Sequence, residues 1–404
     1  MFATVAFTNA VPSTLSFTVL AILVERAGGS SVAISTVVTV HFAGILFFAP
    51  VWGAVADVTG RRRGVIVGTT AFATVSLVLI GITRSVVGYI GLRGLYAVFF
   101  AAFAPLMFTI VSEHGGVEGR GRLLGEFNSA RSVGFALGQV LAGVFIARFT
   151  SVEIFLVLGA TSFLTLLGTV YVDDPSPVER TTPTLSDLFA RVRTRLVPIS
   201  GERGEFWDSG LLCVYLGTVL QSVAFFGLLS LLPVYLVSEV GVAEVLVGVF
   251  LAINPGGRVL FMYVFGHFSG TRTHKPMILI GLLGTGVFTV TMAAASVPGV
   301  PLYRQGLAAL ALIAMAIALS AFTIGSLAFI SAVAPLNRES ELMGLRDTAR
   351  AIGGIVGPVL LGSVVTLLGF ERGFLVWTLF PLLGTAIVVR GLGGSGESTT
   401  ASAS

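Results

Sequence analysis

The chain has 404 residues, of which 55% are hydrophobic and only 11% are charged. A typical soluble protein carries about 25% charged residues, so a soluble globular protein is excluded. The net charge of +4 is not gathered on a polar domain, so we expect no nucleic-acid partner. The single cysteine, Cys213, excludes an intrachain disulfide and a cysteine-based metal cluster, and we expect no cofactor and no metal.

Apolar runs long enough to cross a hydrocarbon core of about 30 Å recur along the whole chain. The first six predicted helices cover residues 2–24, 31–56, 64–83, 86–112, 126–148 and 152–172. The second six cover residues 209–238, 243–268, 275–297, 303–333, 343–368 and 371–390. The predicted fold class is therefore an all-α membrane protein with 12 transmembrane helices in two pseudo-symmetric six-helix bundles, residues 1–172 and 209–390.

The first apolar run is too long for the core of a signal peptide and lacks a basic segment before it, so we interpret it as a retained span. The short stretch before it leaves open whether the N-terminus is complete. With a cytoplasmic N-terminus, the inner loops and tail carry 15 basic residues and the outer loops carry 5. This bias follows the positive-inside rule, so both termini are predicted to lie in the cytoplasm and the protein in the cell membrane.

A polar linker, residues 173–208, joins the two predicted bundles. Its stretch TLSDLFARVRTRLV places Thr184 three residues before Asp187, as in a capping box, and spaces its apolar residues helically. Arginines occupy the flanks and the polar side, which predicts a short amphipathic helix on the inner membrane surface, with a solvated charged helix as the alternative. The Gly/Ser/Thr-rich tail, residues 391–404, is predicted to be disordered.

The fifth predicted helix is repeated in the eleventh. Residues 125–143 and 344–362 agree without a gap at eight of nineteen positions, at an offset of 219 residues. The matched pairs include Arg131 with Arg350, Gly134 with Gly353, Gly138 with Gly357, and Gly143 with Gly362. Six spans repeated in the same orientation are typical of carriers whose halves rock about a central site. Glycines at four-residue steps allow close helix packing or bending, and both interpretations stay open.

The loop after the second predicted helix carries glycine, aspartate and arginine in a fixed pattern. It reads GAVADVTGRRRG, with Gly53, Asp57, Gly60, Arg61, Arg62 and Arg63. Gly60 suits a tight turn, and Asp57 can pair with arginines or cap a helix. The loop resembles the Gly-x-x-x-Asp-x-x-Gly-Arg-Arg/Lys signature of the major facilitator superfamily, and it lies between the spans where that family places it.

This resemblance implies a secondary transporter that works by alternating access. It also implies that Asp57 locks the cytoplasmic ends of the two halves near Arg346, Asp347 and Arg350, whereas a basic loop that only sets topology is the alternative. The gating residues predicted in this way include Arg131 and its repeat partner Arg350. In the fourth span, Arg93 lies where many proton-coupled members carry Arg-x-x-Gln-Gly, although Tyr96 and Ala97 replace the Gln and Gly.

Four arginines and one histidine fall within predicted spans, where each charge needs a cavity or a partner because insertion costs about 2.5 kcal/mol or more. Arg131 and Arg350 are expected to snorkel or to pair locally with Asn128 and Asp347. Around Arg258, the sequence NPGGR predicts an interruption of the eighth helix beside a buried charge, as in carrier ligand sites, or else a packing kink.

The predicted transport cavity contains His41, Arg93, Gln221, Asn254, Arg258 and Asn9. His41 lies near the bilayer middle and either carries a proton or forms a neutral structural contact. No Asp or Glu falls in the middle third of a predicted span, so the cavity is expected to be electropositive and to favour neutral or anionic substrates.

The sequence therefore predicts a transporter of small molecules and not an enzyme. Proton-coupled efflux of drug-like or lipophilic compounds is the first hypothesis, and uptake or exchange of an organic anion or sugar-like metabolite is the alternative. A membrane enzyme is a remote third, because His114, His267 and His274 are scattered and no metal-binding spacing occurs. The expected partners are a small-molecule substrate, protons and the lipid bilayer, and we expect a monomer.

Overall fold

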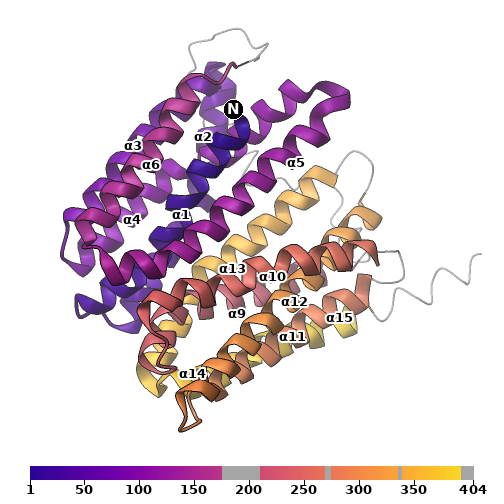
Figure 1. Ribbon diagram of the computed structural model, residues 1–404. Helices are drawn as coiled ribbons and strands as arrows, with labels where there is room; N and C mark the ends of the chain where they lie inside the picture. Colours follow the sequence, from indigo (N-terminus) through magenta and orange to yellow (C-terminus); the bar gives the residue numbers. More distant parts are fainter. Residues whose placement is uncertain (175–209, 269–273, 335–338, 393–404) are drawn as a thin grey trace, which may run out of the picture. The chain divides into compact units, whose positions relative to one another are not determined.

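A computed structural model describes residues 1–174, 210–268, 274–334 and 339–392 (Figure 1). Within these residues, 12 helical spans are long and apolar enough to cross a membrane. The N-terminal half contains α1 (Phe2–Arg26), α2 (Ser31–Thr59), α3 (Arg62–Ile82), α4 (Val86–Phe100), α5 (Phe103–Arg148) and α6 (Ser151–Val170). The C-terminal half contains α9 (Leu211–Ser238), α10 (Glu244–His267), α11 (His274–Ala294), α12 (Pro301–Val333), α13 (Glu339–Leu368), α14 (Phe370–Trp377) and α15 (Leu379–Gly391).

The all-α fold and the 12 spans are as predicted. The predicted surface helix of the linker and nearly all of the predicted tail lie outside the described residues. Large apolar side chains such as Val87 and Leu367 are more than 80% exposed on the helix surfaces. An aqueous solvent would penalise such faces, whereas lipid covers them without cost, so the chain is a multi-pass membrane protein.

The boundary between the fourth and fifth spans differs from the prediction. After α4 ends at Phe100, a turn at Ala101 and Ala102 leads into α5, and the fourth span continues to Gly116. Gly116 has a φ of 57°, which only glycine adopts without strain, and it separates this span from the fifth, Arg122–Arg148. The fourth span therefore ends at Gly116, a few residues later than the apolar pattern predicted.

The predicted interruption of the eighth helix is wrong. α10 runs from Glu244 to His267 as one helix, with Pro255 inside it. Proline removes only one backbone donor, and within a membrane no water competes for the hydrogen bonds of the other residues. The helix therefore continues past the proline, and Asn254 and Arg258 are side chains of an intact helix.

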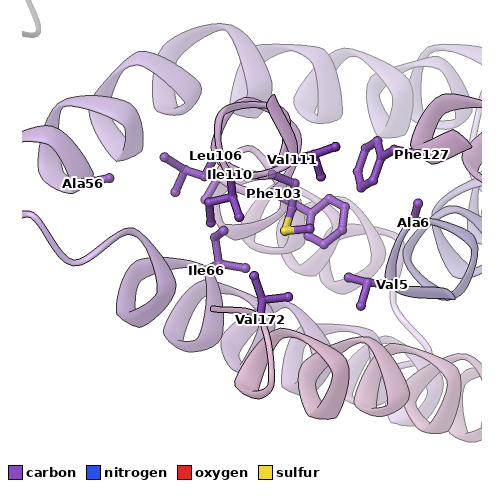
Figure 2. Packing of buried hydrophobic residues seen from close by; sticks show 12 residues of the cluster. Val5, Ala6, Ala56, Ile66, Phe103, Leu106, Ile110, Val111, Phe127 and Val172 are labelled. Atoms are coloured by element: carbon purple, nitrogen blue, oxygen red, sulfur yellow. The ribbon is translucent and has the colours of Figure 1, made fainter. Parts of the chain in front are cut away.

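The described chain divides into two compact units. Unit 1 comprises Met1–Gly29, Thr36–Pro198 and Glu244–Val249, and unit 2 comprises Ser30–Ser35, Ile199–Ala243 and Phe250–Ser404. In unit 1, α1 packs on α5 and α6, and α3 packs on α4 and α6. Its apolar core gathers side chains from α1, α2, α3 and α5, among them Val5, Ile66, Phe103 and Phe127 (Figure 2).

Unit 2 repeats this neighbour pattern six spans later. α9 packs on α13 and α15, and α11 packs on α12, α14 and α15. Each helix of this set has the same neighbours as its counterpart in unit 1, with the last span divided at Thr378 into α14 and α15. The internal repeat predicted from the fifth and eleventh spans therefore extends to the packing of the two units.

The matched glycines of the repeat lie where two helix backbones meet. A Cβ atom at Gly138 of α5 would lie 2.6 Å from the carbonyl oxygen of Val11 on α1. At Gly353 of α13 it would lie 2.8 Å from the carbonyl oxygen of Val219 on α9. Both distances are shorter than a real Cβ contact, so these positions admit only glycine without a backbone shift. Close packing is thus the observed role of these glycines.

Candidate functional site

Unit 2 contains a pocket of about 70 Å³ within its helix bundle. The lining comes from α9, α10, α12 and α13: Thr218, Gln221, Ser222, Phe225, Phe226, Arg258, Leu319, Phe322, Thr323, Arg346 and Arg350. Polar groups line one part and phenylalanine rings another. A volume of this size holds a few water molecules or the charged end of a small organic molecule.

Three arginines give this pocket its charge. Arg346 is 8% exposed, and its Nε donates to Ser326 Oγ at 3.0 Å. Arg350 is exposed, and its guanidinium carbon lies 5.5 Å from the ring centroid of Phe226. Arg258 is repelled electrostatically by both of the others, and its buried Nε has no hydrogen-bond partner among the described residues.

The only carboxylate paired with these arginines in the described residues is Asp347. Its Oδ1 lies 3.7 Å from Arg346 Nη1, and its side chain is 74% exposed. The ion pair of Asp347 is therefore with the neighbouring Arg346 and not, as predicted, with Arg350, which packs on Phe226 of α9. One solvated carboxylate leaves the pocket with a net positive charge.

Gln221 carries both a satisfied and an unsatisfied polar atom. Its Nε2 donates to Thr285 Oγ1 of α11 at 2.6 Å. Its Oε1 is buried and has no hydrogen-bond partner within the described part of the chain. The side chain as a whole is only 2% exposed. An unpaired buried acceptor is costly, so this atom marks a position where a ligand or water completes the site.

A second polar cluster lies inside unit 1 around Arg93, which is fully buried. Its Nη1 donates to Ser16 Oγ at 2.7 Å, and its guanidinium carbon lies 4.1 Å from the Phe17 ring and 5.0 Å from the Tyr96 ring. Its Nε and Nη2 have no partner in the described residues. Arg93 is thus held by a hydroxyl and two aromatic faces.

His41 shares these aromatic neighbours. Its ring centroid lies 4.6 Å from that of Phe17 and 6.3 Å from that of Tyr96, and the side chain is 4% exposed. The structure therefore brings together His41 and Arg93, two residues that the sequence placed in one predicted cavity from different helices. Asn9 lies close by, in a pocket of about 10 Å³ that Tyr96 also lines, which is room for about one water molecule.

The predicted cavity residues thus divide between the two units. Gln221 and Arg258 line the pocket of unit 2, whereas His41, Arg93 and Asn9 belong to the polar cluster inside unit 1. Asn254 is 9% exposed, its Nδ2 is unpaired among the described residues, and it is not part of the lining of either pocket.

Sequence reasoning assigned Arg346 to the gating region and missed it as a pocket residue, together with Ser222 and Thr218. Thr218 lies three residues before Gln221 and four before Ser222, so it neighbours each of them on the surface of α9, and this spacing is the signal that could have found it. In the described residues, no group of His, Cys, Asp and Glu side chains is placed to hold a metal ion.

The arginines at the end of the loop after α2 form hydrogen bonds within unit 1. Arg62 Nη1 contacts both carboxylate oxygens of Glu113 at 2.7 Å. The Arg63 guanidinium donates to the carbonyl of Val170, and its backbone nitrogen donates to Asp174 at 3.2 Å. The loop therefore links α3 to the fourth span and to the end of α6.

Twelve membrane spans in two units of repeated topology, each with a cluster of buried polar side chains, are typical of membrane carriers. The sequence model of the Major Facilitator Superfamily matches residues 2–303 and 214–401. The chain belongs to this superfamily, as the loop signature predicted.

The chain is similar to the following individual proteins. It is 25% identical to "Probable anion transporter 4, chloroplastic" of Arabidopsis thaliana over 70% of this chain and 55% of the relative, so the match spans about half of that protein. It is 23% identical to "Multi-drug resistance efflux pump PmrA homolog" of Lactococcus lactis subsp. lactis (strain IL1403) over 83% of this chain and 79% of the relative. A solved POT family transporter in complex with a thioalcohol conjugated peptide has a TM-score of 0.78 at 13% identity, covering 96% of this chain and 94% of that one.

Proposed function

We propose that the chain is a secondary transporter of small organic anions and that the pocket of unit 2 binds the anionic group. The observation that carries the proposal is the convergence of Arg258, Arg346 and Arg350 on one pocket with a single solvated carboxylate beside them. Guanidinium groups donate in a fork that matches carboxylate and phosphate oxygens. The relative named as an anion transporter supports the same class of substrate.

Electrostatics inside a membrane protein favour this assignment. Three like charges in one pocket repel each other, and the low dielectric of the surroundings strengthens that repulsion. An anion relieves it and supplies an acceptor for the unpaired Nε of Arg258. A cationic substrate would instead add to the repulsion, so cations are disfavoured as substrates.

Transport by purified protein in proteoliposomes tests the proposal. We expect uptake of at least one class of labelled small carboxylates or of phosphate, and Arg346→Gln and Arg350→Gln to lower it at least tenfold. Arg84→Gln is the matched control, because Arg84 is exposed and lies outside both pockets. Movement of cationic dyes with no response to anions would contradict the proposal.

Proton-coupled efflux of lipophilic compounds is the second candidate. The phenylalanines at positions 225, 226 and 322 of the same lining favour it, as does the relative named as a multidrug efflux pump. An imposed pH gradient in the same proteoliposomes separates the two. Gradient-driven movement of a neutral lipophilic compound that is lost in Arg93→Met and His41→Ala would favour efflux.

The orientation of the chain in the membrane belongs to the same proposal. The excess of basic residues in the predicted inner loops supports cytoplasmic termini in the cell membrane. Labelling of single cysteines introduced at Ser30 and Arg63 from each side of intact cells tests this orientation. Cys213 is replaced by serine in these variants so that it does not react.

A further inference from the structure

The unpaired oxygen of Gln221 bears on which anion the pocket accepts, provided that the proposed anion transport holds. The orientation of the Gln221 amide follows from its neighbour on α11. The Thr285 hydroxyl donates to the carbonyl oxygen of Gly281 at 2.9 Å, so its oxygen is left to accept. It accepts from Gln221 Nε2 at 2.6 Å, which turns Oε1 to the other side.

Gln221 lines a pocket whose charged side chains are all donors, and its Oε1 is a buried acceptor without a partner among the described residues. No group in the described residues donates to this oxygen, including the three arginines of the pocket. The ionised oxygens of a carboxylate or a phosphate cannot satisfy it, because these atoms also only accept. The missing partner is a donor, and a bound molecule that carries a donor of its own can take the place of water there.

The charge of the pocket requires that the donor group be neutral. An amino group would be an ammonium ion at neutral pH and would be repelled by the three arginines. A hydroxyl donates without adding charge. We propose that the pocket selects hydroxylated organic anions, with the arginines binding the anionic group and Gln221 Oε1 accepting a hydrogen bond from the substrate hydroxyl.

Selectivity follows because an anion without the hydroxyl leaves a buried acceptor unpaired. Sites built to hydrogen-bond a hydroxyl discriminate against analogues that lack it. Because the net gain from one neutral hydrogen bond is modest, we expect a preference of roughly tenfold for the hydroxylated member of a matched pair. Thr285 is a positioning residue, since it acts on the substrate only through the amide of Gln221.

The test compares matched anions on the full-length protein in detergent. Lactate is paired with propionate, malate with succinate, and 4-hydroxybenzoate with benzoate, and the dissociation constant of each is measured by titration. We expect the hydroxylated member of each pair that binds to be favoured roughly tenfold. Equal affinities within the pairs that bind would overturn the inference while leaving the proposed anion transport in place. No binding of any anion would overturn both.

Three variants identify the atoms responsible. Gln221→Met removes the acceptor at similar volume and is expected to bring the two affinities of each pair to within twofold of each other. Thr285→Val frees the amide to turn and is expected to reduce the preference while Gln221 is still present.

Thr289→Val is the matched control, because Thr289 lies one turn further along α11 and bonds Gly286 and Thr378 outside the pocket. It is expected to keep the full preference. Loss of the preference in Thr289→Val, or its retention in Gln221→Met, would overturn the assignment to Gln221. The wild-type comparison does not depend on any variant folding.

Discussion

The guanidinium carbon of Arg93 lies 4.1 Å from the ring centroid of Phe17, so a fully buried cation of α4 rests on an aromatic face of α1. Desolvated cation–π contacts with Phe17 and Tyr96 contribute up to about 2 kcal/mol each, and the hydrogen bond to Ser16 contributes about 1.5–3 kcal/mol. Burying one charge costs several kcal/mol. Among the described residues, no carboxylate forms an ion pair with Arg93 that would offset the difference. We therefore expect Arg93 to serve transport more than stability.

We predict that Arg93→Met leaves the melting temperature in detergent unchanged or higher, while transport falls at least tenfold. Methionine fills similar space without a charge to desolvate, and removal of a buried charge is often neutral or stabilising. Scanning calorimetry and proteoliposome transport measure the two quantities. A large drop in melting temperature together with retained transport would show that Arg93 is a structural residue.

The glycine contacts of the repeat lead to a second prediction. A Cβ at Gly357 would lie 2.9 Å from the Cα of Val223, so Gly357→Ala must push α13 away from α9. Overpacking of this kind costs about 1–3 kcal/mol. Gly344 of the same helix has nothing within 4 Å of such a Cβ, so Gly344→Ala should be neutral or stabilise by about 0.5–1 kcal/mol. Denaturant unfolding in detergent distinguishes the pair, and equal effects would refute the close-packing role.

Removal of the solvated carboxylate beside the pocket should strengthen anion binding. Asp347→Asn removes the charge 3.7 Å from Arg346 and leaves the shape unchanged. Because Asp347 is 74% exposed, water and salt screen it, and we expect a gain in affinity of only about twofold to fivefold. The gain should shrink as ionic strength rises. Weaker anion binding in Asp347→Asn would mean that the carboxylate orients Arg346 instead of competing with the substrate.

The contact of Arg62 with Glu113 is expected to stabilise the fourth span against α3. Arg62→Ala and Glu113→Ala should each lower the free energy of unfolding by about 1 kcal/mol, and the double variant should lose little more. A double-mutant cycle from denaturant unfolding measures this coupling. Arg61→Ala serves as the control because Arg61 is exposed on the same loop. Additive effects would show that the two side chains are not coupled.

Some features of this protein followed from the sequence because they depend on solvent and on local pattern. Runs of apolar residues must be helices in lipid, so the 12 spans were predictable to within a few residues except near Gly116 and Thr378. The loop around Asp57 indicated the family, and the glycine pairs indicated the repeat, whereas their close packing became clear only in the structure. The interruption predicted at Pro255 was wrong, because the effect of a proline on a helix depends on the surrounding helices as well as on its own ring.

The composition of the candidate site was decided only by tertiary structure. Arg258, Arg346 and Gln221 lie on three different helices, and nothing in their sequence separation shows that they line one pocket. The same holds for His41 and Arg93, which meet around Phe17. Membership of a site depends on helix rotation and crossing, which are set by packing at many contacts at once. A buried atom without a partner, such as Gln221 Oε1, becomes visible only when every possible donor around it has a position.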